Sequence, residues 1–290
     1  TRISAPIDTV WVRDYGPFGL TASGKPGIVD SIYRHYQYRR NDDAVPQAVG
    51  KAKGIEVFGM PLILDGGNLL VDSKGNMFMT KRTYSWNSDK SQAQVDAMLK
   101  AYYGVKTVTA FDYPGYPGEP ADGTGHLDMF VKLLGDHTVL ISVADEEPFK
   151  STSQKAIEWF KSHKAGDGQD YKVITVKGWY TDAWYTYTNS LVVNGTAIIP
   201  SYSGKPQEEA AAKAAYEQAG YKVAPVLSDE SILYGGSIHC TTQSIPKAAG
   251  LKAEAVFTAA PEARGAEVTA PLAPLKSKGD GSALDQLIGK

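Results

Sequence analysis

The chain of 290 residues has a single cysteine, Cys240, so no disulfide can form within it. It also lacks an excess of either charge. Its 30 basic and 32 acidic side chains leave a net charge of -2, which argues against a nucleic-acid binder driven by bulk charge. No stretch approaches the roughly 20 apolar residues that a membrane span needs. We therefore expect neither a nucleic acid nor a membrane as a partner.

The chain does have enough apolar residues for a sizeable core, since 42% of it is hydrophobic and 10% is aromatic. It begins at Thr1, which predicts that a segment has been removed upstream. Seventeen tyrosines beside one cysteine favour a secreted or periplasmic enzyme, with the cytoplasm as the alternative.

A unit of two strands, a helix and a third strand recurs along the chain. In one copy, a hairpin turn at residues 72–76 is followed by a helix that we expect to be capped by Ser88 and stopped by Gly104. We expect copies at residues 12–58, 68–111, 127–176 and 191–227, and the start of a fifth at Ser237.

Self-similarity of this kind predicts an α/β fold, a five-bladed pseudo-symmetric propeller, because closure hides the edge strands. An ordinary α/β sandwich is the alternative. The rest of the fifth unit would come from residues before Thr1 or from residues 251–257 and beyond. We assign residues 1–260 to a catalytic propeller domain and residues 261–290 to a strap or linker-like tail, where periodicity is lost.

One polar cluster stands at the predicted start of each unit's first strand. In a propeller these strand starts line the central axis, so the clusters would meet in one pocket. Each cluster alone is weak, because a lone Asp there is usually a turn residue and a free cysteine is usually a buried apolar side chain. Together they predict a site. The clusters are Trp11–Asp14, Asp65–Asn68, Gly125–Asp128, Tyr187–Asn189 and Ser237–Cys240.

Strand alternation predicts how these side chains point. His126 and Asp128 are two residues apart and would leave the same face, whereas His239 would point away from Cys240. We therefore expect His126, not His239, to be the partner of Cys240. No His-x-x-x-His or Cys-x-x-Cys spacing occurs, and we expect neither a metal nor an organic cofactor.

These residue types predict chemistry on a guanidinium group. A thiolate beside a histidine can attack a planar electrophilic carbon. Two carboxylates, Asp14 and Asp128, match the forked donors of a guanidinium. His126 could protonate the departing amine and then activate water. The predicted outcome is hydrolysis to a urea group and ammonia.

The same residues resemble the family of agmatine deiminases and bacterial-type peptidylarginine deiminases, which are guanidino-group modifying enzymes. The resemblance implies a five-bladed α/β propeller in which Cys240 is the nucleophile and His126 the acid and base. It implies that Asp14 and Asp128 grip the guanidinium. The matching motifs are Trp11–Pro17, Gly66–Asn68, Gly125–Asp128, Tyr187–Asn189 and Gly236–Cys240.

The resemblance also implies that Asn189 helps to order the substrate and the site, and we assign Trp11 and Asn68 to substrate binding. Residues 33–43 resemble the peptidylarginine branch, in which arginines before Asn-Asp-Asp contact the substrate's main chain or carboxylate. Arg39 is the candidate for that contact. One departure points elsewhere: Asp65 precedes Gly66-Gly67 where agmatine deiminases often have Glu.

The expected function is that of a protein-arginine deiminase, a hydrolase that converts peptidyl or free arginine to citrulline and ammonia through a covalent cysteine intermediate. Its partners would be arginine-containing peptides or proteins, or a small guanidino compound. The nearest alternative is an agmatine deiminase. A non-catalytic propeller that binds arginine and an amidinotransferase are further alternatives.

Overall fold

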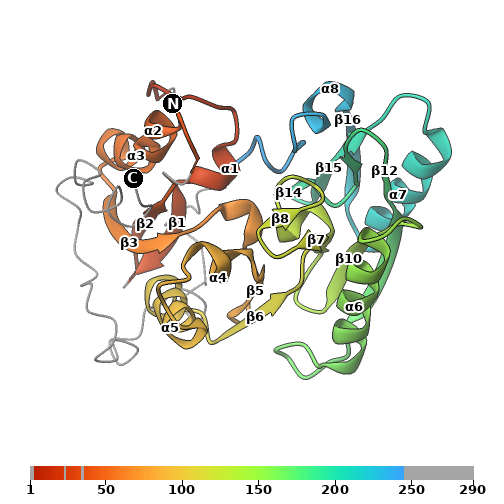
Figure 1. Ribbon diagram of the computed structural model, residues 1–290, viewed down its shortest axis with the longest axis horizontal. Coiled ribbons are helices and arrows are strands. Elements are labelled where there is room, and N and C mark those ends of the chain that lie inside the picture. The colour runs from red at the N-terminus through yellow and green to blue at the C-terminus, as the bar shows by residue number, and fades with distance from the viewer. Residues whose placement is uncertain (1–2, 23, 34–35, 245–290) are drawn as a thin grey trace.

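The computed structural model describes residues 3–22, 24–33 and 36–244 (Figure 1). Four three-stranded sheets share one topology in these residues. An antiparallel hairpin comes first, and a third strand then pairs in parallel with the hairpin's second strand. In Figure 1 the units follow one another around the molecule in chain order, from red at the left to cyan at the right.

A helix connects the second and third strands of each unit, as parallel pairing requires. The sheets are β1 (Phe18–Ala22), β2 (Lys25–Ile32), β3 (Glu56–Ile63); β4 (Leu70–Val71), β5 (Asn76–Thr80), β6 (Thr107–Phe111); β9 (Val131–Leu133), β10 (Thr138–Val143), β11 (Lys172–Lys177); and β14 (Leu191–Val193), β15 (Thr196–Ser201), β16 (Lys222–Leu227). The helices are α3 (Val45–Lys53), α5 (Gln92–Tyr103), α6 (Phe149–Ser162) and α7 (Pro206–Gln218).

Short elements fill the connections between and within these units. The short helices are α1 (Val12–Tyr15), α2 (Arg40–Asp43), α4 (Arg82–Trp86) and α8 (Asp229–Ile232), with the 3-10 turns η1 (Gly66–Asn68) and η2 (Leu127–Met129). Two small hairpins pair β7 (Gly115–Tyr116) with β8 (Glu119–Pro120), and β12 (Trp179–Tyr180) with β13 (Trp184–Tyr185).

Local sequence explains where α5 begins and ends. Ser91 and Gln94 form a capping box, in which each side chain accepts a hydrogen bond from the other residue's backbone N–H. The helix ends at Gly104, whose φ of 67° is left-handed. The sequence analysis placed the cap at Ser88. Ser91 is the cap because Gln94 stands three residues after it.

Neighbouring units are joined by shared apolar cores. Phe78 of β5 and Phe160 of α6 belong to successive units, and their ring centroids lie 5.5 Å apart. Phe111 of β6 stacks on Phe160 at 5.4 Å, and both residues are buried. Burying such a ring stabilises the fold by about 1.5–3 kcal/mol relative to exposure. The units therefore hold each other in register, which fixes the turns that lie between them.

The α/β class and the four copies of the unit are as predicted from the sequence. The positions of the polar clusters differ from the prediction: Asp14 lies in α1, Gly67 in η1 and Asp128 in η2, all in turns that precede the strands. The remainder of the fifth unit, the boundary at residue 260 and the tail at 261–290 lie outside the described residues, so propeller closure stays a prediction. Among the described helices, none is both long and apolar enough to cross a membrane.

Candidate functional site

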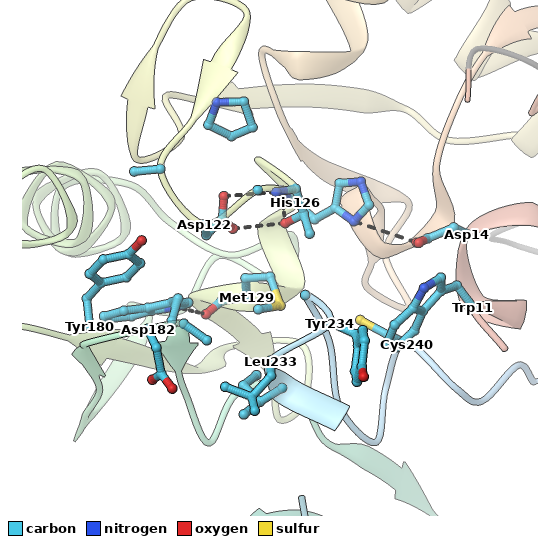
Figure 2. A pocket seen from close by; sticks show the side chains of 18 of the residues that line it. Trp11, Asp14, Asp122, His126, Met129, Tyr180, Asp182, Leu233, Tyr234 and Cys240 are labelled. Carbon is cyan, nitrogen blue, oxygen red and sulfur yellow. Dashed lines mark hydrogen bonds and ion pairs between the residues drawn. The ribbon is translucent and has the colours of Figure 1, made fainter. Parts of the chain in front are cut away.

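A cavity of about 460 Å³ collects residues from turns that are far apart in the sequence (Figure 2). Five of the predicted site residues line it. They are Trp11, Asp14, Arg39, His126 and Cys240. Two more, Asp128 and Asn189, are completely buried and contact Cys240 from behind the cavity wall. The polar clusters therefore meet as predicted, although Asn68 itself does not line the cavity.

Asp14 and His126 converge on the backbone of Gly67. The N–H of Gly67 donates to Asp14 Oδ1 at 3.0 Å, and His126 Nδ1 lies 3.6 Å from the same oxygen. A Cβ built on Gly67 would lie 2.8 Å from both atoms and 3.3 Å from Asp128 Oδ2. The two carboxylates and the imidazole thus surround one point, and glycine is needed there because any side chain would occupy it.

The second ring nitrogen of His126 bonds Asp65, which the sequence analysis included in a polar cluster but to which it gave no role. His126 Nε2 lies 2.9 Å from Asp65 Oδ2, which also accepts the hydroxyl of Tyr36 at 3.0 Å. Burial opposes the charge on this imidazole, but Asp14 and Asp65 outweigh it and raise the pKa of His126 to about 10. His126 is therefore a protonated acid at neutral pH. The position of Asp65 directly before Gly66-Gly67 was the feature of the sequence that could have indicated its place in the site.

Asn189 connects the cysteine to Asp128. Its Nδ2 lies 3.1 Å from Cys240 Sγ and donates to Asp128 Oδ2 at 3.1 Å. Its Oδ1 accepts the backbone N–H groups of Ser237 and His239 at 3.0 and 3.1 Å. One buried amide therefore fixes both the thiol and the turn that carries it, in line with the ordering role that the resemblance implies.

Burial sets the protonation of the acidic groups. Desolvation raises the pKa of Asp14 to about 6 and that of Asp128 to about 7. Burial, with the nearby charges of Asp128 and Asp14, raises the pKa of the Cys240 thiol well above its ordinary value. A cation placed between the carboxylates would offset their charge and favour the thiolate.

Strand alternation predicted that His239 would point away from the site, and this prediction is wrong. Its Nδ1 lies 2.6 Å from Asp128 Oδ2, and Cys240 Sγ lies 3.8 Å from the same oxygen. Residues 237–242 form a turn, so the period of two does not apply to them. His126 and Cys240 both line the cavity and His239 does not, so His126 remains the histidine that faces the cavity.

Arg13 holds the cysteine turn against α1. Its backbone N–H donates to the carbonyl of Cys240 at 3.1 Å, and its Nε donates to the carbonyl of His239 at 3.3 Å. Its Nη1 donates to Gln243 Oε1 at 2.7 Å. The sequence analysis quoted Arg13 only as part of a motif. Its partners lie 226 and 230 positions further along the chain, so no local sequence pattern could indicate the contact.

The three proposed substrate-binding residues outside the carboxylates differ in position. Trp11 lines the cavity beside Cys240. Arg39 also lines it, donates to the hydroxyl of Tyr33 at 2.7 Å and stacks 4.3 Å over the ring of Tyr36. Asn68 is completely buried away from the cavity, so its assignment to substrate binding is corrected.

Asn68 instead joins three elements. Its Oδ1 accepts the N–H groups of Thr80 and Leu127 at 2.9 and 3.1 Å, and its Nδ2 donates to Thr83 Oγ1 at 3.0 Å. It therefore ties η1 to β5, α4 and η2, and sets the distance between Gly67 and His126.

One group among the described residues has the spacing of metal ligands. The ligand atoms of Asp14, Asp65 and His126 lie within 4.8 Å of one another. These side chains already take hydrogen bonds from Gly67 and Tyr36 and pair with each other.

Comparison with known proteins agrees with this geometry. Proteins named "Putative agmatine deiminase" from Vibrio parahaemolyticus and Legionella pneumophila (strain Paris) are 25% and 27% identical to the chain, with 84% of it covered in both cases and 77% and 75% of their own lengths. The solved agmatine deiminase of Enterococcus faecalis has the same fold, with a TM-score of 0.72 at 21% identity, over 82% of this chain and 75% of that one. The family model of the Porphyromonas-type peptidyl-arginine deiminases matches residues 1–246. The chain belongs to this family and is a deiminase-type hydrolase that acts on guanidino groups.

Proposed function

We propose that the chain is an agmatine deiminase, which hydrolyses the guanidinium of agmatine to a ureido amine and ammonia through a covalent intermediate on Cys240. One observation carries the proposal: a cysteine lines a cavity, and at the wall of this cavity two buried carboxylates and a protonated imidazole converge around Gly67. The names of the curated relatives support agmatine, the alternative in the sequence analysis, over peptidyl arginine.

Asp14 and Asp128 would bind the guanidinium by charged hydrogen bonds from its planar donors. Each carboxylate must be ionised for this. The pKa is about 6 for Asp14 and about 7 for Asp128, so both lose their protons as the pH rises through this range. The bound cation would then lower the pKa of the Cys240 thiol, since it offsets the two negative charges that raise it. Substrate binding would thus help to generate the nucleophile.

In the first chemical step, the thiol of Cys240 loses its proton to solvent, and the thiolate adds to the guanidinium carbon and forms a C–S bond. His126 gives its proton to one terminal nitrogen, the C–N bond breaks, and ammonia leaves. A water then adds to the remaining carbon while neutral His126 takes its proton. The C–S bond breaks, which returns the thiolate and releases the ureido product. Asp65 would hold the His126 ring in orientation through both steps.

The charges that line the cavity favour a cationic substrate. Asp14, Asp122 and Asp182 contribute three carboxylates, against two cations, the guanidinium of Arg39 and the protonated imidazole of His126. Asp182 is exposed, and Thr181 and Tyr185 hydroxyls bond it. It would meet the ammonium that agmatine carries at its other end. Free arginine carries a carboxylate near that ammonium, and an arginine residue in a peptide has no charged group there.

Peptidyl arginine is the second candidate because of Arg39. Its guanidinium lines the cavity and could meet a main-chain carbonyl of a peptide, as the resemblance to the peptidylarginine branch implies. Arg39 is already engaged by the Tyr33 hydroxyl and the Tyr36 ring. It would therefore have to give up part of these contacts to bind a substrate.

The test is ammonia release measured side by side on agmatine, free arginine and a blocked arginine peptide, with Cys240→Ser as the blank. We expect the highest kcat/KM on agmatine. Asp182→Asn should then reduce kcat/KM for agmatine and spare the blocked peptide, whereas Arg39→Ala should spare agmatine. A wild type that prefers the blocked peptide would replace agmatine by peptidyl arginine, and no release from any of the three would overturn the proposal.

A further inference from the structure

His239 is buried beside the site, yet no chemical step above uses it. Its side chain is 7% exposed, and it does not line the cavity. Its contacts are nevertheless specific. Nδ1 lies 2.6 Å from Asp128 Oδ2, the oxygen that also accepts from Asn189 and lies 3.8 Å from the sulfur of Cys240.

The surroundings of Asp128 Oδ2 give the direction of this hydrogen bond. The amide of Asn189 donates to Oδ2, and the thiol of Cys240 lies on the same oxygen. An oxygen that receives several donors is the acceptor of an ionised carboxylate. His239 Nδ1 therefore carries the hydrogen and donates it to Asp128.

The backbone of His239 holds the imidazole in place. Its N–H donates to Asn189 Oδ1 at 3.1 Å, and its carbonyl accepts from Arg13 Nε at 3.3 Å. The backbone that carries the ring is therefore fixed by Arg13 of α1 and by Asn189.

The charged groups around His239 keep its ring neutral. Burial lowers the pKa of His239, and three cations lower it further: Lys132 of β9, Arg13 of α1 and His126 before η2. Asp128 is the acidic group that the ring contacts, and the thiol of Cys240 lies on the same carboxylate oxygen. A neutral donor can orient the Asp128 carboxylate without cancelling the negative charge that a guanidinium needs.

We propose that His239 is a positioning residue, which donates Nδ1–H to Asp128 and so favours the ionised form of this carboxylate and aligns it for the guanidinium of the substrate. The proposal rests on the role that the proposed function gives to Asp128. It gives the two histidines different roles: His126 transfers protons, and His239 orients the Asp128 carboxylate that accepts hydrogen bonds from the substrate.

The ring geometry provides a matched pair of variants. An Asn amide nitrogen can take the place of Nδ1, whereas a Gln amide nitrogen reaches toward Nε2. His239→Asn should thus keep the hydrogen bond to Asp128 and His239→Gln should lose it. His163→Gln is the control, because His163 is exposed at the end of α6, where it stacks on Trp159.

Two alkylating reagents distinguish a displaced Asp128 carboxylate from a change in the intrinsic reactivity of Cys240. Cys240 is the one cysteine of the chain, so both reagents report on it alone. 2-Chloroacetamidine is a cation and needs the carboxylates, whereas iodoacetamide is neutral. We expect His239→Gln to lower the rate of inactivation by chloroacetamidine and kcat/KM for agmatine by about 10- to 100-fold, as the loss of one charged hydrogen bond would. The iodoacetamide rate should change by less than about threefold.

The pH profile gives an independent readout. Removal of a hydrogen-bond donor raises the pKa of a carboxylate. The acid limb of the pH profile of the chloroacetamidine inactivation rate should therefore shift to higher pH by about one unit in His239→Gln. In His239→Asn the limb should stay in place, and the rates should remain within about threefold of the wild type.

Equal losses in the Asn and Gln variants, equal losses with both reagents, or an unmoved acid limb in His239→Gln would each overturn the proposal. Failure of the proposed function looks different. In that case the wild type releases no ammonia from agmatine, while the comparison of the two reagents still tests the role of His239.

Discussion

A single methyl group on Gly67 should disable the site while the rest of the fold remains. Gly67→Ala places a Cβ 2.8 Å from both Asp14 Oδ1 and His126 Nδ1. Ordinary van der Waals contact begins at 3.4 Å, so these two atoms would have to move away by about 0.6 Å. Neither can do so freely, because Gly67 N–H bonds Asp14 and Asp65 bonds the other side of the His126 ring.

The size of the effect follows from the precision that catalysis needs. A misplacement of about 1 Å can cost about 100-fold in rate, so a shift of roughly half that size should lower kcat/KM for agmatine by about tenfold or more. Overpacking should also destabilise the fold by about 1–3 kcal/mol. Ammonia release measures the first effect, and urea unfolding measures the second.

Gly54→Ala is the control for a general loss of stability. Gly54 ends α3 with a φ of 65°, and no atom lies within 4 Å of an added Cβ there. The left-handed backbone should cost about 1 kcal/mol without effect on kcat/KM. The reasoning fails if Gly67→Ala retains kcat/KM within about twofold, or if Gly54→Ala loses as much activity.

Three further predictions concern the nucleophile, the carboxylates and the brace at Asn68. Cys240→Ser should lower kcat by at least about a thousandfold and keep the Kd for agmatine, as measured by stopped-time assay and calorimetry; a small loss in kcat would exclude a covalent step. The raised pKa values of Asp14 (about 6) and Asp128 (about 7) mean that kcat/KM should rise with pH between about 6 and 7, because only the ionised carboxylates bind a cation. An acid limb near pH 4 would contradict this. Asn68→Ala should lower the free energy of unfolding by about 3 kcal/mol, since it leaves two buried N–H groups without partners. A raised KM at unchanged stability would instead restore Asn68 to substrate binding.

The sequence was sufficient to predict the repeating unit because hairpin turns and helix ends are local signals. Gly104, for example, ends its helix as expected. The meeting of Asp14, His126 and Cys240 was predicted from matching places in the repeat and from the family motifs. The directions of the Asp128 and His239 side chains could not be predicted by strand alternation, because Asp128 lies in a 3-10 turn and His239 in another turn. Such turns have no fixed period along the chain.

The contact between Arg13 and the turn at His239 and Gln243 has a consequence for how the protein becomes active. The partners are 226 and 230 residues apart in the sequence, so closing this loop comes at a high entropic cost and no local nucleus can form it. During refolding, helical signal should therefore return before Cys240 becomes reactive toward chloroacetamidine. In a newly made chain Cys240 would be synthesised after the four units, and activity would appear only once those units had folded.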